Sequence, residues 1–234
     1  ASLRRDGSSR LGANNKYATF PSAAIAWNVA KEPFLQNAGA IDNLKVRASY
    51  GKTGNQGVPA YGTLSTLNIA GTAAISNGVG VAGVTQGNLA NPNLMWETTS
   101  QYDLGFEIAL FKARLTAEID IYYKKTEDLL LNAETPFYTG YTSTIQNVGS
   151  LENRGVDISL NGVIIESDDF QFDATINFST FKNKVTDLGI KSFIETKRLP
   201  APANDANSQL IVGEPVGTFW GAMYEGIDSE TGEA

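Results

Sequence analysis

The sequence predicts an all-β protein whose long antiparallel strands form a segment of a transmembrane β-barrel. Two observations lead to this fold class: strands of alternating apolar and polar residues that run beyond ordinary length, and connections that alternate between tight turns and long loops. Strands in soluble domains usually have about five or six residues. Longer strands with one apolar and one polar face suit a barrel that meets lipid outside and water inside.

The clearest alternation covers residues 96–110. From Trp96 to Leu110 most even positions are bulky and apolar, and the odd positions are polar or small. A tight turn at 111–113 follows, and the alternation resumes from Leu115 to Lys124. Because a period of two sends successive side chains to opposite faces, these residues predict a hairpin of two long strands.

Further segments show the same period. They cover 17–29, 44–50, 154–164 (with Val163 as an exception) and 170–180, so the chain is expected to hold six or seven strands. A helical turn around Glu32-Pro33-Phe34-Leu35 is expected in the link between the first two of these segments.

The lengths of the links predict the topology. The links at 111–113 and 165–169 are tight, whereas those at 51–95, 125–153 and from 181 onward are long. Successive antiparallel strands place alternate links at opposite ends, so one rim is expected to carry short periplasmic turns and the other long extracellular loops. Residues 53–95 have eight glycines and no charge, and we expect them to form a surface loop without a core of its own.

The composition excludes several functions. The net charge of −7 argues against a general affinity for nucleic acid. Cysteine and histidine are absent, which excludes disulfides, zinc–thiolate sites and any catalytic pair that needs either residue. No run of about 18 apolar residues is present, so no transmembrane helix is expected. The first ten residues have no apolar signal-peptide core, and both ends are expected to be cut from a longer chain.

The alternation also predicts which side chains face the lumen. A register slip of one residue would move every side chain to the other face, so a structure can clearly contradict this prediction. The residues expected to face outward are Leu104, Phe106, Ile108, Ile119, Ile121, Ile158, Leu160 and Ile176. The residues expected to face the lumen are Lys45, Arg47, Glu97, Gln101, Asp103, Glu107, Glu118, Asp120, Asp157, Asn161, Asp173 and Asn177.

Two motifs resemble catalytic or nucleotide-binding sites, but both have simpler structural interpretations. Gly51-Lys52-Thr53 resembles a phosphate-binding loop, but the required preceding glycine is Val46. Glu118 and Asp120 share a strand face and could form a glycosidase pair, although alternating carboxylates on a wet face need no catalytic explanation. We therefore expect neither an enzyme nor a cofactor.

Two acidic turns and one sequon complete the candidate motifs. Asp168-Asp169 and residues 204–207 could offer oxygen ligands to calcium, but neither has the spacing of a known loop, and solvated turns explain them better. The sequon at Asn177-Phe178-Ser179 lies in the middle of a strand and is treated as chance.

Aromatic residues in the long links are candidates for contact with substrate or partner. They are Tyr61, Phe137, Tyr138 and Tyr141. Such side chains could stack on a sugar, pack under a partner protein, or fold the loop onto the rim, and the sequence leaves these alternatives open.

Several motifs spread over essentially the whole chain resemble those of one family, the SusC/RagA-type TonB-dependent transporters of the Bacteroidota outer membrane. The motifs are Arg5-Asp6-Gly7-Ser8-Ser9-Arg10, Phe20-Pro21-Ser22 with Ala26-Trp27, Leu44-Lys45-Val46-Arg47-Ala48-Ser49-Tyr50-Gly51 with Thr53-Gly54-Asn55-Gln56, Asn91-Pro92-Asn93-Leu94-Met95-Trp96-Glu97-Thr98-Thr99, Asn147-Val148-Gly149 with Asn153-Arg154-Gly155-Val156, Gly213-Glu214-Pro215-Val216-Gly217 and Glu225-Gly226-Ile227.

The resemblance implies a function. Such a protein has an N-terminal plug inside an outer-membrane barrel of about 22 strands. It imports glycans or peptides, is energised through the TonB complex, and is capped by a SusD-like lipoprotein. Residues 1–234 would then be part of one barrel domain, without the plug, the TonB-contacting segment or the C-terminal strands. The alternatives are a TonB-dependent siderophore or vitamin receptor and a soluble β-sandwich that binds glycans or acts as an adhesin.

Overall fold

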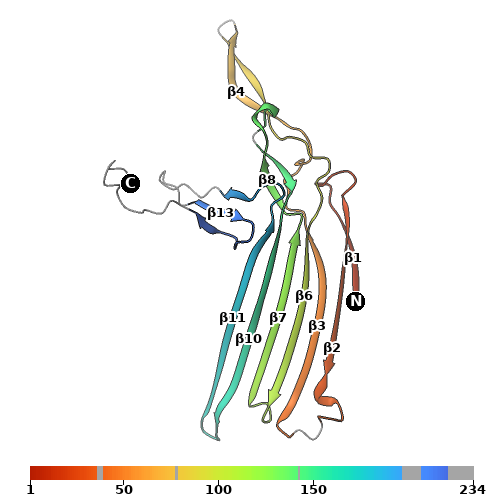
Figure 1. The fold of residues 1–234 in the computed structure, drawn as a ribbon, viewed down its shortest axis with the longest axis vertical. Helices are drawn as coiled ribbons and strands as arrows, with labels where there is room; N and C mark the ends of the chain where they lie inside the picture. The colour runs from red at the N-terminus through yellow and green to blue at the C-terminus, as the bar shows by residue number, and fades with distance from the viewer. Residues whose placement is uncertain (36–38, 77–78, 142, 197–206, 221–234) are drawn as a thin grey trace, which may run out of the picture.

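Six long strands and one short strand form one antiparallel sheet in the computed structural model, which describes the chain except for residues 36–38, 77–78, 142, 197–206 and 221–234. The order of the sheet, β1-β2-β3-β6-β7-β10-β11, follows the chain (Figure 1). No helix in these described ranges is long and apolar enough to cross a membrane. The strands are β1 (Ser2–Gly7), β2 (Tyr17–Asn28), β3 (Ile41–Asn55), β6 (Glu97–Leu110), β7 (Leu115–Glu127), β10 (Ser150–Glu166) and β11 (Gln171–Asp187).

The six predicted strands are confirmed, and most run further than the alternation indicated. β3 continues to Asn55, β7 to Glu127 and β11 to Asp187. In these extensions the strands remain paired through backbone hydrogen bonds, although neither face of the sheet needs apolar side chains. The apolar–polar alternation therefore ends before the strands do. β1 was missed because its six residues contain one bulky apolar side chain, Leu3. It is held by pairing with β2 from Ser2 to Gly7.

Short links gather at one end of the sheet, as predicted (Figure 1). In the turn between β6 and β7, Phe111, Lys112 and Ala113 all have φ near +60°, a conformation that costs energy for residues with a side chain. Asp42 Oδ2 accepts a hydrogen bond of 3.0 Å from Ala113 N, which helps to hold this turn. The helical turn expected at 32–35 is preceded by a short 3-10 helix, η1 (Val29–Lys31).

The long links lie at the other end, which we call the long-loop rim, and they contain strands that were not predicted from the sequence. Residues 67–76 pair with 79–86 as a hairpin, which is held by backbone hydrogen bonds. Residues 130–134 pair with 143–147 in the same way, and residues 193–196, 207–211 and 218–220 form a small sheet. The elements are β4 (Leu67–Ser76), β5 (Val79–Gln86), β8 (Leu130–Glu134), η2 (Phe137–Thr139), β9 (Ser143–Asn147), β12 (Phe193–Thr196), β13 (Asn207–Ile211) and β14 (Thr218–Trp220).

A compact hydrophobic core joins the bases of the loops at the long-loop rim. This rim core consists of Leu11, Phe20, Val58, Leu94 and Trp96. Trp96 was expected on the apolar face of the strand, but it precedes β6 and is 6% exposed. Its ring meets that of Phe20 edge-on at a centroid distance of 5.5 Å. The uncharged 53–95 segment therefore does contribute to a core, through Val58 and Leu94.

Hydrogen bonds tie the same three loops together around the rim core. Gly12 N donates to Leu94 O at 2.8 Å, and a Cβ at Gly12 would collide with the carbonyl of Pro92. Asn147 Nδ2 donates to Met95 O at 2.9 Å, while its Oδ1 accepts from Met95 N at 2.9 Å. The same Nδ2 also donates to Asp128 O at 3.0 Å. Residues in two of the resemblance motifs, 91–99 and 147–149, therefore hold the bases of these loops together.

We predict that Leu94→Ala loosens the loops at the long-loop rim without disrupting the sheet. Leu94 is fully buried, and truncating a buried leucine costs about 2–5 kcal/mol. Limited proteolysis of the full-length barrel should then cut 56–96 and 128–149 faster than in the parent protein. Leu64→Ala, at a leucine 55% exposed, is the matched control. Equal cleavage rates in parent, variant and control would contradict the role assigned to the core.

Candidate functional site: the polar face and the long-loop rim

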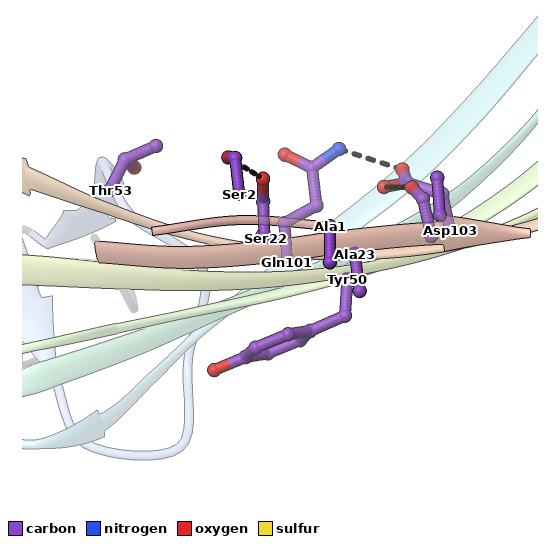
Figure 2. A pocket seen from close by; sticks show the side chains of 11 residues that line it. Ala1, Ser2, Ser22, Ala23, Tyr50, Thr53, Gln101 and Asp103 are labelled. Carbon is purple, nitrogen blue, oxygen red and sulfur yellow. Dashed lines mark hydrogen bonds between the residues drawn. The ribbon is translucent and has the colours of Figure 1, made fainter. Parts of the chain in front are cut away.

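The residues predicted to face the lumen all lie on one face of the sheet. Cross-strand partners point to the same side, and Glu107 lies opposite both Lys45 and Glu118. Figure 2 shows Gln101 and Asp103 on one side of the sheet and Tyr50 on the other. That this face lines a lumen stays a prediction. The residues that share it are Lys45, Arg47, Glu97, Gln101, Asp103, Glu107, Glu118, Asp120, Asp157, Asn161, Asp173 and Asn177.

The opposite face is apolar and open. Leu104, Ile121 and Ile176 are 39%, 43% and 63% exposed, although large apolar surfaces are normally covered in soluble proteins. Toward the long-loop rim this apolar area ends in a row of tyrosines on β3, β6 and β7. The rings of Tyr50 and Tyr102 lie 4.9 Å apart, and Tyr123 follows at 6.4 Å from Tyr102. Aromatic rows of this kind mark the edge of the lipid-facing band in membrane barrels.

An ionic network centred on Arg47 crosses three strands of the polar face. Arg47 Nη2 lies 2.8 Å from Glu118 Oε1 and 2.9 Å from Asp120 Oδ1. Its Nε lies 3.1 Å from Glu107 Oε1, but without hydrogen-bond alignment, so this contact is electrostatic. Lys45 Nζ lies 3.1 Å from the same Glu107 oxygen. Two cations thus bind three carboxylates, and the guanidinium links β3 to β6 and β7.

Gly105 makes room for this network. It lies opposite Arg47 on β3 and opposite Asp120 on β7. A Cβ at this position would collide with Asp120 Oδ1 and would lie 2.9 Å from Arg47 Nε. A residue with any side chain would therefore push the guanidinium away from its carboxylates.

A shallow hollow of about 480 Å³ lies beside the network and is shown in Figure 2. Asp103 organises its polar wall, accepting 3.0 Å and 2.7 Å hydrogen bonds from Ser49 Oγ and Gln101 Nε2. A hydroxyl pair, Ser2 and Ser22, closes one side with a 2.7 Å hydrogen bond. Hydroxyl, amide and carboxylate groups of this kind can hydrogen-bond a polar solute.

The polar face continues on β10 and β11 with hydrogen bonds instead of ion pairs. Ser179 Oγ donates to Asp157 Oδ1 at 2.6 Å, and Asn161 Nδ2 donates to Thr175 Oγ1 at 2.8 Å. Asp173 is exposed on the same face. The ionic part of the wall is therefore concentrated on β3, β6 and β7.

The candidate catalytic and ligand motifs have structural roles instead. Glu118 and Asp120 bind the same guanidinium, and residues 51–53 lie within strand β3. Asp168-Asp169 forms the bend between β10 and β11, while residues 204–206 lie outside the described residues. In the described part of the chain, no group of three or more acidic side chains is placed to hold a metal ion. The sequon lies in the middle of β11.

The predicted loop aromatics lie on the long-loop rim. Tyr61 and Tyr138 are 71% and 90% exposed. Tyr141 Oη lies 3.4 Å from Ser65 Oγ and so connects the two long loops. Phe137 begins η2, but its side chain lies outside what the structure describes. The role of Asn147, which joins two loops through hydrogen bonds to Met95 and Asp128, was not identified from the sequence. Its place in a resemblance motif was the only indication in the sequence.

We predict that Arg47→Met lowers the melting temperature of the full-length barrel by a few degrees. Half-exposed ion pairs contribute about 0.2–1 kcal/mol each, and the variant leaves three carboxylates near one another with Lys45 as their remaining cation. Arg47→Lys keeps the charge but loses the planar set of guanidinium donors, so its melting temperature should lie between those of the parent and Arg47→Met. Lys112→Met, at an exposed turn lysine, is the control. An unchanged melting temperature in Arg47→Met would contradict the network's role.

Comparison with known proteins agrees with this geometry. A family model described as "TonB dependent receptor-like, beta-barrel" matches residues 1–232. TonB-dependent receptor P26 of Formosa agariphila is 44% identical over 223 residues, which are 95% of this chain and 22% of that protein. TonB-dependent receptor SusC of Bacteroides thetaiotaomicron is 35% identical over 190 residues, which are 80% of this chain and 19% of that protein.

The fold comparison gives the same answer. The structure of the RagAB peptide transporter superposes with a TM-score of 0.82 at 31% identity, over 98% of this chain and 24% of that one. The chain thus spans about a quarter or less of these relatives. The sheet is a segment of a barrel wall and not half of a β-sandwich, and the resemblance to the SusC/RagA type is confirmed. The chain belongs to the family of TonB-dependent receptor-like β-barrels.

Proposed function

We propose that this chain forms part of the wall and extracellular loops of an outer-membrane TonB-dependent importer for oligosaccharides or peptides. The observation that carries the proposal is the two-faced sheet, in which a hydrogen-bonded ionic face lies behind an exposed apolar face that ends at a tyrosine row. Backbone groups are satisfied in a bilayer when a sheet of this kind is closed into a barrel by the remaining strands. The family and its importer relatives, SusC and RagAB, support the same function.

The polar face acts as a rigid, hydrated wall. Its cations on β3 are bound to protein carboxylates at 2.8–3.1 Å, so they do not attract free anions. A wall of this kind lets polar solutes pass without trapping them. It suits a neutral or mixed-charge substrate better than a strongly charged one.

The long-loop rim is where substrate and partner would meet the protein. Residues 53–95 are uncharged, and Tyr61 and Tyr138 present exposed rings above the rim core. Flat aromatic faces pack on sugar rings and on peptide side chains. A SusD-like lipoprotein would cap this rim, and the TonB complex would act through the N-terminal part of the full protein.

Arginine substitutions test which face meets lipid. In the full-length barrel, Leu160→Arg and Ile176→Arg should strongly reduce assembly, because a cation on the lipid face near the midplane costs about 2–4 kcal/mol. Asn161→Arg and Thr175→Arg, on the hydrated face of the same strands, are the matched controls and should assemble well. Heat-modifiable gel mobility measures assembly. Equal yields at both pairs of positions would refute the lipid-facing assignment.

Loop shortening tests the role in uptake. Replacing the β4–β5 hairpin, residues 67–86, with a short Gly-Ser link keeps Val58 and Leu94 in the rim core. Removing residues 136–140 likewise keeps Asn147 in place. We expect each variant to reach the cell surface normally but to support slower growth on the cognate oligosaccharide or peptide. Normal growth with both loops shortened would mean that they only cover the barrel.

A further inference from the structure

Between the tyrosine row and the long-loop rim, the side chains on the apolar face of the sheet change from apolar to basic. Cross-strand pairing places Arg154 opposite Tyr123, and Lys182 opposite Arg154. One two-residue step closer to the long-loop rim, the next row contains further lysines on β3, β7 and β11. We call these residues the basic belt: Lys52, Lys125, Arg154, Lys182 and Lys184.

The charge of this belt opposes that of the protein. These two rows and the next step toward the rim hold five cations against three carboxylates, Glu127, Glu152 and Asp187, whereas the chain carries a net charge of −7. Each carboxylate already has a neighbour in the chain. Glu127 binds Lys125 at 2.8 Å, Glu152 lies opposite Lys125, and Asp187 Oδ1 accepts a hydrogen bond of 3.1 Å from Gly189 N.

Within the described part of the chain, the cations on β10 and β11 form no such ion pair, although Glu152 lies opposite Lys184 in the register. Arg154, Lys182 and Lys184 are exposed, and none of them takes part in the ion pairs of the described residues. Arg154 and Lys182 face each other directly across the strands, and like charges in that position destabilise a sheet. An anion bound between them would reverse the sign of this interaction.

The contrast with the other face is informative. On the polar face, Lys45 and Arg47 are held by three carboxylates of the protein. On the apolar face Arg154, Lys182 and Lys184 remain open to an external anion, and they lie beside a tyrosine row of the kind that marks the edge of the lipid-facing band. The anion with access to that place is a headgroup of the surrounding lipid.

We propose that the basic belt binds the phosphate groups of outer-leaflet lipid, with Arg154, Lys182 and Lys184 as the core of the site. The inference rests on the proposed function, because it requires that the apolar face meets lipid and that the long-loop rim lies outside the cell. The guanidinium of Arg154 offers a bidentate contact to phosphate, and the two lysines add point charges. The apolar residues below the tyrosine row contact the acyl chains of the same lipid.

The test uses the full-length barrel that contains this chain, inserted into phosphatidylcholine vesicles. The vesicles contain either lipid A with its phosphates or the same lipid with the phosphates removed. After detergent extraction, native mass spectrometry measures the lipid A retained per barrel. The belt variant is Arg154→Gln/Lys182→Gln/Lys184→Gln. Its matched control, Lys16→Gln/Lys112→Gln/Lys124→Gln, removes the same charge from residues outside the belt.

The expected result is selective loss in the belt variant. The parent and the control should retain phosphorylated lipid A in preference to the dephosphorylated lipid. Each cation close to an anionic surface contributes about fivefold to binding, so three lost charges should lower retention about a hundredfold. A second variant, Arg154→Lys/Lys182→Arg/Lys184→Arg, keeps every charge and should retain most of the binding.

Other results would overturn the inference in distinguishable ways. If an inserted parent retains both lipids equally, or if the belt variant and the control lose equally, the belt is not a phosphate site while the barrel proposal stands. If the charge-keeping variant behaves like the belt variant, local distortion explains the loss and the inference fails. If the parent does not insert as a heat-modifiable barrel, the proposed function and this inference fail together.

Discussion

Backbone pairing in the seven-stranded sheet is the constraint on which the rest of this structure depends. In hydrocarbon there is no water to satisfy amide and carbonyl groups, so each strand must pair continuously with its neighbours. Once the ladder is continuous, the two-residue period assigns every side chain to one face or the other. The ionic face, the apolar face and the basic belt are all consequences of a single register.

The ionic network shows how that register is used on the polar face. Arg47 reaches carboxylates on two strands because Gly105 leaves the space between them empty. The three carboxylates would repel one another without the guanidinium. The charges are thus paired across strands rather than along one strand.

The long-loop rim is built on a different principle. There the side chains of two loops and of β2 are buried together around Leu94, and Asn147, from a third loop, closes the arrangement with a pair of hydrogen bonds to Met95. Packing of this kind separates a fixed base from the loop tips above it. The tips can then vary in sequence, and in the ligands they contact, while the barrel keeps its shape.

The sequence by itself determined the long strands, their two faces and the alternation of short and long links. These features are local, since a period of two and a tight turn can be read without knowing any partner strand. The resemblance motifs also identified the family. The same local signal included Trp96 in the strand, whereas it precedes β6 and is buried in the rim core, because alternation cannot tell where a strand begins.

Only the tertiary structure decided what depends on contacts between distant residues. β1 carries almost no apolar signal and exists through its pairing with β2. The rim core joins Leu11 from one loop with Val58 and Leu94 from the two ends of another, and no local pattern indicates that such residues meet. The sequence alone does not indicate the basic belt either. Its cations come from β3, β7, β10 and β11, and they become neighbours only when the strands pair in this register.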